Sequence, residues 1–243
     1  MHTTHYKFWP KMPTSLTLPQ TSLYDNLHVS AKRYPEKTAL YYYGTTVTYK
    51  ELHREVLALS GFLQKALKVN EGEKVLLFMQ NSPQFISAYY AINRADAVVV
   101  PINPMLTANE LEFYIKDCDI KTAVVGLELY EKVAPLLETT SLTNIVIASY
   151  SDYIHSNDYT KLPKEVTEQR KSFNKENHYW WNEAIKLNYE PTEHKANANT
   201  LAVIPYTSGT TGLPKGCMHT NQTVNANIIG SYHLSHGTTN TVH

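Results

Sequence analysis

Residues able to bind phosphate groups are concentrated in one stretch near the end of the chain. It reads Tyr206-Thr-Ser-Gly-Thr-Thr-Gly-Leu-Pro-Lys-Gly216 and holds three of the nine glycines in the 243-residue sequence. Glycines let backbone N–H groups turn inward and approach a ligand closely. Hydroxyl groups donate to phosphate oxygens, and a lysine adds a point charge. The stretch therefore predicts a loop that wraps a polyphosphate. The candidate phosphate-binding residues are Thr207, Ser208, Gly209, Thr210, Thr211, Gly212 and Lys215.

Two generic motifs do not fit this stretch. A Walker A loop that began at Gly209 would need a glycine at position 214 and a hydroxyl residue at position 216, where the chain has Pro214 and Gly216. A nucleophile elbow needs glycines two residues before and two residues after its serine, and Ser208 has none at these offsets. A loop with no ligand is disfavoured, because the glycine spacing, the hydroxyls and the preceding apolar run 201–206 occur together.

The elements that must position this loop follow a simple rhythm. Short apolar runs, typical of buried strands, alternate with amphipathic helical patterns. Such alternation predicts an α/β fold, namely a doubly wound, mostly parallel sheet with helices on both faces. Strands are expected at 38–43, 46–48, 74–79, 97–102, 122–125, 144–148, 201–206 and 217–219. Helices are expected after Ser22, after the capping boxes Thr48-x-x-Glu51 and Thr107-x-x-Glu110, after Ser82-Pro83, at 127–137, near 178–186 and from about Asn221.

The same pattern divides the chain into four segments. Residues 1–20 contain three prolines and are expected to form an extended arm, and residues 21–148 an α/β subdomain. The rhythm stops in the polar segment 149–200, where we expect an irregular surface insertion with one short helix. It resumes in 201–243 with the loop, its flanking strand and a helix. Because no further strand follows, we expect this last unit to be incomplete and the domain to be truncated.

The overall composition is that of an ordinary globular protein, with 42% hydrophobic and 18% charged residues. Lys plus Arg and Asp plus Glu number 22 each, so the charge gives no argument for nucleic acid as a partner. The two cysteines, Cys118 and Cys217, are far apart in sequence, which favours a reducing, cytoplasmic location. No apolar run reaches the ~18 residues of a membrane span. Peripheral contact with a membrane and a homodimer are both compatible with the sequence.

The loop resembles the signature loop of the AMP-forming adenylating enzymes. This superfamily includes acyl-CoA synthetases, peptide-synthetase adenylation domains and luciferases. The resemblance covers essentially the whole chain, because segments 34–39, 47–52, 81–85 and 98–104 are similar to the N-terminal part of the same family. Within the family, Trp9-Pro10, segment 81–85 and Asn103-Pro104 with Thr107 are most similar to long- or medium-chain fatty acyl-CoA ligases.

This resemblance implies an ATP-dependent reaction in two steps. A carboxylate attacks the α-phosphate of ATP to give an acyl-adenylate and pyrophosphate, and a thiol then takes the acyl group. It implies ATP and Mg²⁺ as cofactors, coenzyme A as co-substrate, and a carboxylic acid, here a fatty acid, as substrate. The fold would be part of the large N-terminal domain of an acyl-CoA synthetase.

The resemblance also implies a role for each loop residue. Backbone N–H groups of residues 208–212 and nearby hydroxyls would hold the β- and γ-phosphates, and Lys215 would offset their charge. Thr207 would help to coordinate Mg²⁺, which offsets charge on the departing pyrophosphate. Because the family's loop opens and closes, Gly209 and Gly212 would act as hinges. The hydroxyls that would donate to the phosphates are those of Ser208, Thr210 and Thr211.

Other parts of the family's machinery have no match in residues 1–243. These are the glutamate that helps Thr207 to bind Mg²⁺, the aspartate that binds the ribose, most of the acyl tunnel, and the lid domain with its catalytic lysine. We therefore expect no catalytic residue in this chain, and no complete adenylation by the chain alone. Two alternatives stay open: an adenylation domain that loads a carrier protein, and a non-catalytic module that kept the fold.

Overall fold

The structure, a computed structural model, describes residues 15–154, 162–170, 175–207 and 212–235. Helices in these residues are α1 (Leu23–Arg33), α2 (Tyr49–Lys65), α3 (Pro83–Arg94), α4 (Ala108–Cys118), α5 (Tyr130–Val133), α6 (Lys164–Thr167), α7 (Trp181–Lys186) and α8 (Asn221–Ser235), with 3-10 turns η2 (Leu127–Leu129), η3 (Ala134–Leu137) and η4 (Tyr150–Tyr153). Strands are β1 (Thr38–Tyr42), β2 (Thr45–Thr48), β3 (Lys74–Phe78), β4 (Val98–Pro101), β5 (Thr122–Gly126), β6 (Asn144–Ala148), β7 (His178–Trp180), β8 (Leu201–Val203), β9 (Tyr206–Thr207), β10 (Lys215–Gly216) and β11 (His219–Thr220).

A seven-stranded sheet organises the described residues, in the order β11-β8-β4-β3-β5-β6-β7. Every neighbouring pair from β8 to β7 is parallel, and only β11 runs antiparallel, against β8. From β3 the chain winds outward to β4, and from β5 it winds the opposite way to β6. The predicted doubly wound, mostly parallel sheet is confirmed.

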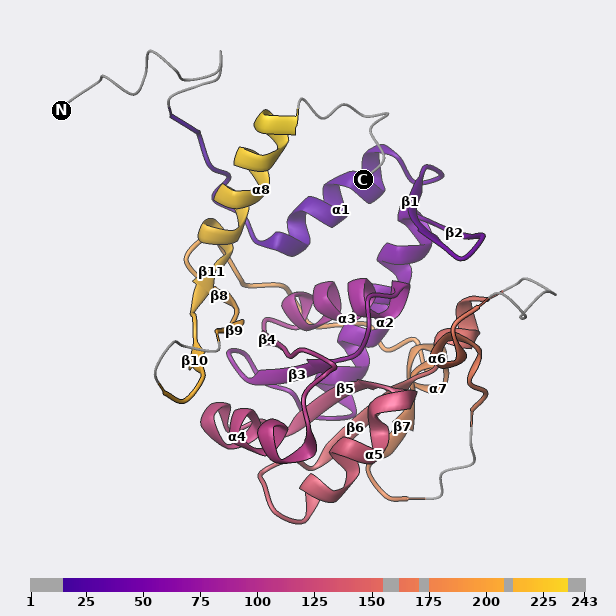
Figure 1. Cartoon of the computed structure of the whole chain (residues 1–243). Coiled ribbons are helices and arrows are strands. Elements are labelled where there is room, and N and C mark those ends of the chain that lie inside the picture. The colour runs from indigo at the N-terminus through magenta and orange to yellow at the C-terminus, as the bar shows by residue number, and fades with distance from the viewer. Residues whose placement is uncertain (1–14, 155–161, 171–174, 208–211, 236–243) are drawn as a thin grey trace.

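Helices cover both faces of this sheet (Figure 1). One face packs under α1, α2, α3 and α7, and the other under α4 and α5. Alternate residues of β3 divide between the two cores: Val75 and Leu77 belong to the first, Leu76 and Phe78 to the second. Because both faces are buried, the strands have the continuous apolar sequences typical of parallel sheets.

The helix starts confirm the caps expected from sequence. Thr48 with Glu51 and Thr107 with Glu110 form complete capping boxes before α2 and α4. Ser82 caps α3 with Pro83 at its first position. A further capping box pairs Ser22 with Asp25 at the start of α1. Each box satisfies backbone donors that a helix terminus leaves without partners.

Two expectations about helices are wrong. The helix expected at 127–137 is broken into η2, the four-residue α5, and η3. Pro135 lies in η3, and proline lacks the N–H that an α-helix needs while its ring crowds the preceding turn. The short helix expected near 178–186 is half strand: His178–Trp180 form β7, which pairs in parallel with β6, and only Trp181–Lys186 are helical.

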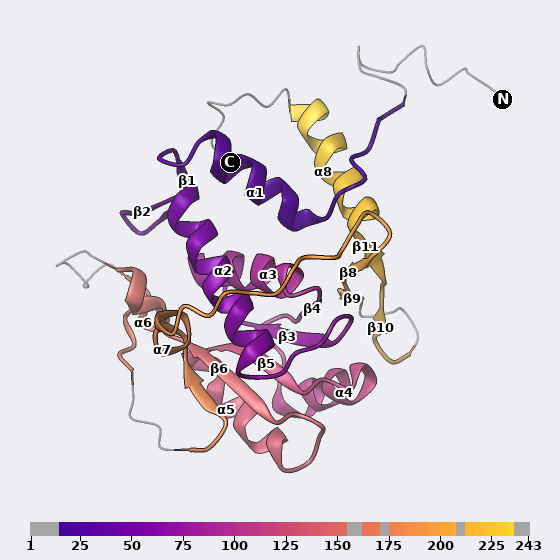
Figure 2. The ribbon, with the colours of Figure 1, turned by 180° about the vertical axis from the view of Figure 1, so that it is seen from behind.

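Residues 187–200 then cross the molecule as a strap that links α7 to β8. Figure 2 shows this segment running over α2 and α3. Gln64 Oε1 of α2 accepts from the Thr192 amide at 2.9 Å, and Arg94 of α3 donates to the Thr192 carbonyl at 2.8 Å. The polar segment therefore contributes an edge strand and a strap on α2 and α3. The division of the chain at residues 20, 148 and 200 stays a prediction, and residues 1–14 of the expected arm lie outside the described residues.

A histidine pair between α1 and α2 predicts acid sensitivity. His53 Nε2 lies 2.9 Å from the Tyr24 hydroxyl and 3.2 Å from His28 Nδ1. Burial, reinforced by the nearby charges of His28, Arg94 and Lys32, lowers the pKa of His53 to about 4. In the unfolded chain its pKa returns to about 6.5, so the unfolded state binds more protons below that pH.

We therefore expect the stabilising contribution of neutral His53 to be complete above pH 6.5 and to fall as the pH drops towards 4. Urea unfolding measured between pH 7 and pH 5 should show lower stability at the acid end. The His53→Gln variant should show a flatter profile, because glutamine does not titrate. An equal slope in both proteins would contradict this assignment. Asp25 of α1 acts on the other member of the pair, because its charge opposes the lowering of the His28 pKa by burial.

Candidate phosphate-binding site

The candidate loop is closed at its base by a short hairpin of β9 and β10. In this antiparallel pair Thr207 is directly opposite Lys215, and Tyr206 is opposite Gly216. Directly opposite residues project their side chains to the same face. Thr207, Gly212 and Lys215 are all exposed. The other four candidate residues, Ser208, Gly209, Thr210 and Thr211, lie outside the described residues.

The hairpin starts where β8 leaves the central sheet. Val203 of β8 is aligned with Val99 of β4, and the Ile204 amide donates to the Val99 carbonyl at 2.9 Å. Two residues later the chain enters β9, and the Cys217 amide closes the hairpin on the Pro205 carbonyl at 2.8 Å. The loop therefore follows the carboxyl end of a parallel strand, a common location of ligand-binding residues in α/β proteins.

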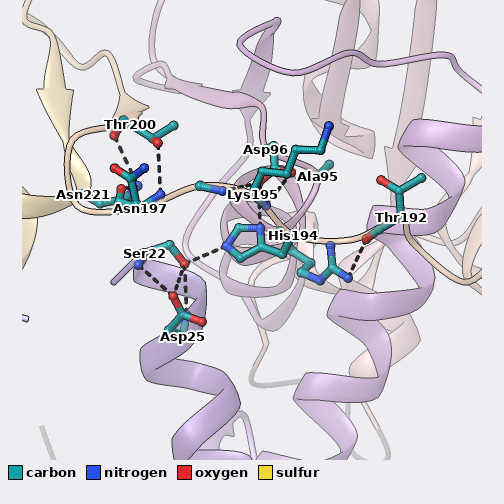
Figure 3. A network of polar contacts seen from close by, with 12 residues as sticks. Ser22, Asp25, Ala95, Asp96, Thr192, His194, Lys195, Asn197, Thr200 and Asn221 are labelled. Atoms are coloured by element: carbon teal, nitrogen blue, oxygen red, sulfur yellow. Dashed lines mark hydrogen bonds and ion pairs between the residues drawn. The ribbon is translucent and has the colours of Figure 1, made fainter. Parts of the chain in front are cut away.

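A second polar network fixes the chain segment that leads into β8 (Figure 3). Asp96, at the turn between α3 and β4, accepts from the amides of Lys195 and Ala196 at 3.0–3.2 Å. Its side chain lies 2.7 Å from His194 Nδ1, and His194 Nε2 lies 2.8 Å from Ser22 Oγ. Burial opposes ionisation of Asp96, but the bonds from His194 and the two amides outweigh it and lower its pKa.

The order Ser22–His194–Asp96 is that of a hydrolytic triad, but Ser22 is not placed to attack a substrate. Its side chain is 1% exposed and accepts from the Asp25 amide as the cap of α1, while its own hydroxyl donates to Asp25 Oδ2 at 2.8 Å. The network therefore has a structural role. This network was not predicted from the sequence. In the structure Asp96 has a φ of 59°, a conformation that aspartate tolerates better than most residues.

The sheet's own switch point is filled by protein. General rules for doubly wound sheets place ligands between the carboxyl ends of the strands where the winding reverses, here β3 and β5. Tyr150, 1% exposed, lies there: its hydroxyl donates to Glu128 Oε1 at 2.8 Å and accepts from the Gln80 amide at 2.7 Å. Gly126 makes room, since a Cβ there would lie 2.3 Å from the Tyr150 hydroxyl. The switch point is therefore occupied by Tyr150, whereas the described candidate residues of the hairpin after β8 are exposed.

Whether this site suits Mg²⁺ depends on the phosphate groups that the loop would bind. Among the described residues no group of three or more His, Cys, Asp or Glu side chains is arranged to hold a metal ion. Mg²⁺ bound to nucleotides takes one or two protein oxygens and completes its shell with phosphate oxygens and water. The exposed Thr207 hydroxyl is compatible with that mode, because it lies at the start of the loop.

Comparison with known proteins identifies the family. A family model described as AMP-binding enzyme matches residues 27–242, and the chain belongs to that family. This confirms the resemblance inferred from the loop. A long-chain-fatty-acid–CoA ligase from Bacillus subtilis is 33% identical over 230 residues, which are 89% of this chain and 39% of that protein. The chain thus spans about two fifths of the length of the curated relatives it matches, and corresponds to their N-terminal part.

Solved structures agree on the fold. A long-chain-fatty-acid–CoA ligase from Archaeoglobus fulgidus superposes with a TM-score of 0.72 at 25% identity, over 95% of this chain and 43% of that one. An anthranilate CoA ligase in complex with anthranoyl-AMP superposes with a TM-score of 0.69 at 24% identity, over 85% and 36%. Among the described residues, no helix combines the length and the apolar character needed to cross a membrane.

Proposed function

We propose that this chain supplies the triphosphate-binding part of an ATP-dependent carboxylate–CoA ligase that acts on fatty acids. The observation that carries the proposal is the pairing of Thr207 with Lys215 at the base of an exposed loop, in a chain of the AMP-binding enzyme family. The fatty acid as substrate, and coenzyme A as acceptor, are supported by the printed names of the B. subtilis and A. fulgidus relatives.

In this proposal the loop holds the β- and γ-phosphates of ATP, which leave as pyrophosphate. The Lys215 ammonium offsets charge on the β- and γ-phosphates, and the amides and hydroxyls of residues 208–212 donate to their oxygens. Mg²⁺ would supply charge neutralisation at the phosphates, with Thr207 as one protein oxygen. The glutamate that would help Thr207 to bind Mg²⁺, and the lid lysine, have no counterpart in residues 1–243. Residues 1–243 alone should therefore not release pyrophosphate. A cytoplasmic location, peripheral membrane association and a homodimer stay predictions.

Removing the Lys215 charge is the direct test. Titration calorimetry with MgATP should show binding to the unaltered chain, and Lys215→Ala should weaken it about tenfold or more, the range expected for a charge-assisted hydrogen bond. Lys215→Arg should retain part of the affinity. Lys65→Ala, an exposed lysine at the end of α2, should bind like the unaltered chain.

Three results would count against the proposal. Equal affinities for the unaltered chain and Lys215→Ala would place the nucleotide elsewhere. No binding by the unaltered chain would favour the alternative of a non-catalytic module. Pyrophosphate release in the presence of ATP, Mg²⁺, a fatty acid and coenzyme A, at a rate comparable with a full-length ligase, would show that the separate glutamate and lysine are not needed.

A further inference from the structure

The tyrosine that precedes the loop is held by the end of a distant helix. Tyr206 is only partly exposed, and its ring packs edge-on against Tyr114 of α4, with centroids 4.6 Å apart and planes at 85°. Its hydroxyl donates to Asp117 Oδ2, and the Cys118 thiol lies 3.0 Å from the Tyr206 hydroxyl oxygen. Three residues on one face of α4 therefore contact one side chain of the hairpin.

The number of available protons determines which group donates and which accepts in these hydrogen bonds. Because the single phenolic proton goes to Asp117, the contact with Cys118 leaves the thiol to donate to the phenol oxygen. Burial, with smaller contributions from Asp117 and Cys118, raises the pKa of Tyr206, so the phenol keeps its proton at neutral pH. The hydrogen bonds run from Cys118 through Tyr206 to Asp117.

The position of Asp117 in α4 is unfavourable for a carboxylate as far as the helix itself is concerned. It lies in the last turn of α4, where the helix dipole is negative and cations are favoured. Lys116 next to it already pairs with Glu112 at 2.7 Å. The bond from Tyr206 gives Asp117 a role that α4 itself does not require.

The opposite side of Tyr206 is held by the returning strand. A Cβ on Gly216 would lie 3.2 Å from Tyr206 Cζ and 2.8 Å from Ile204 Cγ2. A side chain at position 216 would therefore press on the ring and on Ile204, and glycine lets β10 approach both. The ring is enclosed between α4 and the Gly216 backbone, and the pair that comes next along the hairpin is Thr207 with Lys215.

We propose that Asp117 and Cys118 are positioning residues for phosphate binding: by holding Tyr206 against α4 they keep Thr207 and Lys215 in place at the base of the loop. This inference rests on the proposed function for its ligand, since the held pair is the one assigned to the phosphates and Mg²⁺. The clamp acts through the backbone, because Tyr206 is covalently adjacent to Thr207 and Gly216 to Lys215.

Amide hydrogen exchange on the full chain tests the clamp without any ligand. The reporter is the peptide that contains the Cys217 amide, which donates to Pro205 in the closed hairpin. Tyr206→Phe and Asp117→Ala should each speed exchange there about tenfold, while Asp117→Asn, which keeps an acceptor oxygen, should stay within about threefold of the unaltered chain. Exchange in β3 should not change. Tyr41→Phe, a 67% exposed tyrosine, and Glu112→Ala on the same helix are the matched controls.

Titration with MgATP and with Mg²⁺-tripolyphosphate then tests positioning. Tyr206→Phe and Asp117→Ala should raise both dissociation constants about tenfold, and Asp117→Asn should restore most of the affinity. Unchanged exchange at Cys217, or an equal increase in β3, would overturn the clamp, the second result because it shows only general destabilisation. A normal affinity in a variant with fast exchange would overturn the positioning role. If the unaltered chain binds neither ligand, the proposed function fails, and the exchange result still decides whether the clamp exists.

Discussion

Replacing Gly61 with alanine is expected to destabilise the folded chain by about 3 kcal/mol or more. A Cβ at this position of α2 would lie 1.8 Å from the carbonyl oxygen of Tyr189 and 2.5 Å from its carbonyl carbon. Both are backbone atoms of the strap, so no rotamer change relieves the overlap. Either the strap must leave α2 or the helix must move from the core that it covers with Leu59 and Phe62.

A second helical glycine gives the control for this variant. Gly230 lies in α8, and the one described atom that a Cβ there would meet is Leu16 Cδ1, at the ordinary contact distance of 3.9 Å. Alanine is favoured over glycine inside a helix by up to about 1 kcal/mol, so Gly230→Ala should be neutral or slightly stabilising. Urea denaturation of both variants measures the difference. If the two variants have the same stability, the strap does not pack on α2 as described.

Replacing Glu55 with alanine is expected to lower the free energy of unfolding by about 4 kcal/mol at pH 7. Its carboxylate accepts from Ser87 Oγ at 2.6 Å, from Trp181 Nε1 at 2.9 Å and from the Tyr153 hydroxyl. Ser87 and Trp181 have no exposed surface in the folded chain. Alanine would therefore leave several donors without their acceptor at once.

Glutamine at position 55 separates the hydrogen bonds from the charge. It keeps an acceptor oxygen for Trp181 and Tyr153, so the loss should be much smaller than with alanine. Burial raises the pKa of Glu55, despite the opposing bonds from Ser87, Tyr153 and Trp181. With the folded pKa above the unfolded one, the part of the stability that depends on the Glu55 proton is complete below about pH 4.5 and is lost as the pH rises through the folded pKa.

The stability difference between Glu55→Gln and the unaltered chain should therefore shift in favour of glutamine between pH 4.5 and pH 7.5. Urea unfolding at several pH values in this range measures that difference, in which groups common to both proteins cancel. A constant difference would show that Glu55 titrates alike in the folded and unfolded chains. An alanine variant as stable as the glutamine variant would show that the three donors find other partners.

Local features were enough to find most elements. The apolar runs of β3 to β6, the capping boxes at Thr48 and Thr107, and Pro83 at the start of α3 all act within a few residues of the chain. Their physical effect does not depend on distant contacts, so reading them in order recovered the parallel sheet. The break at Pro135 was also visible in the sequence, and the expected helix at 127–137 overlooked it.

Strand β7 was beyond such reasoning. His178–Trp180 form only three residues of strand in a polar segment, and no local pattern separates them from the helix that follows. They are extended because β6 offers a free edge, with Ile145 opposite His178 and Ile147 opposite Trp180. The strap likewise depends on a missing side chain at Gly61, more than 120 residues before Tyr189. Strand propensity is weak compared with such pairing.

The candidate loop shows the same difference between what the sequence predicts and what tertiary contacts decide. Its residue types alone predict phosphate chemistry, because glycine, hydroxyl and lysine groups carry their properties wherever they are placed. Which residues hold the loop in position could not be inferred, since Tyr206 and Asp117 are 89 residues apart and meet only when β8 pairs with β4 and the hairpin reaches α4. The chemical properties of the side chains follow from the sequence, whereas their positions depend on contacts between distant segments that only folding brings together.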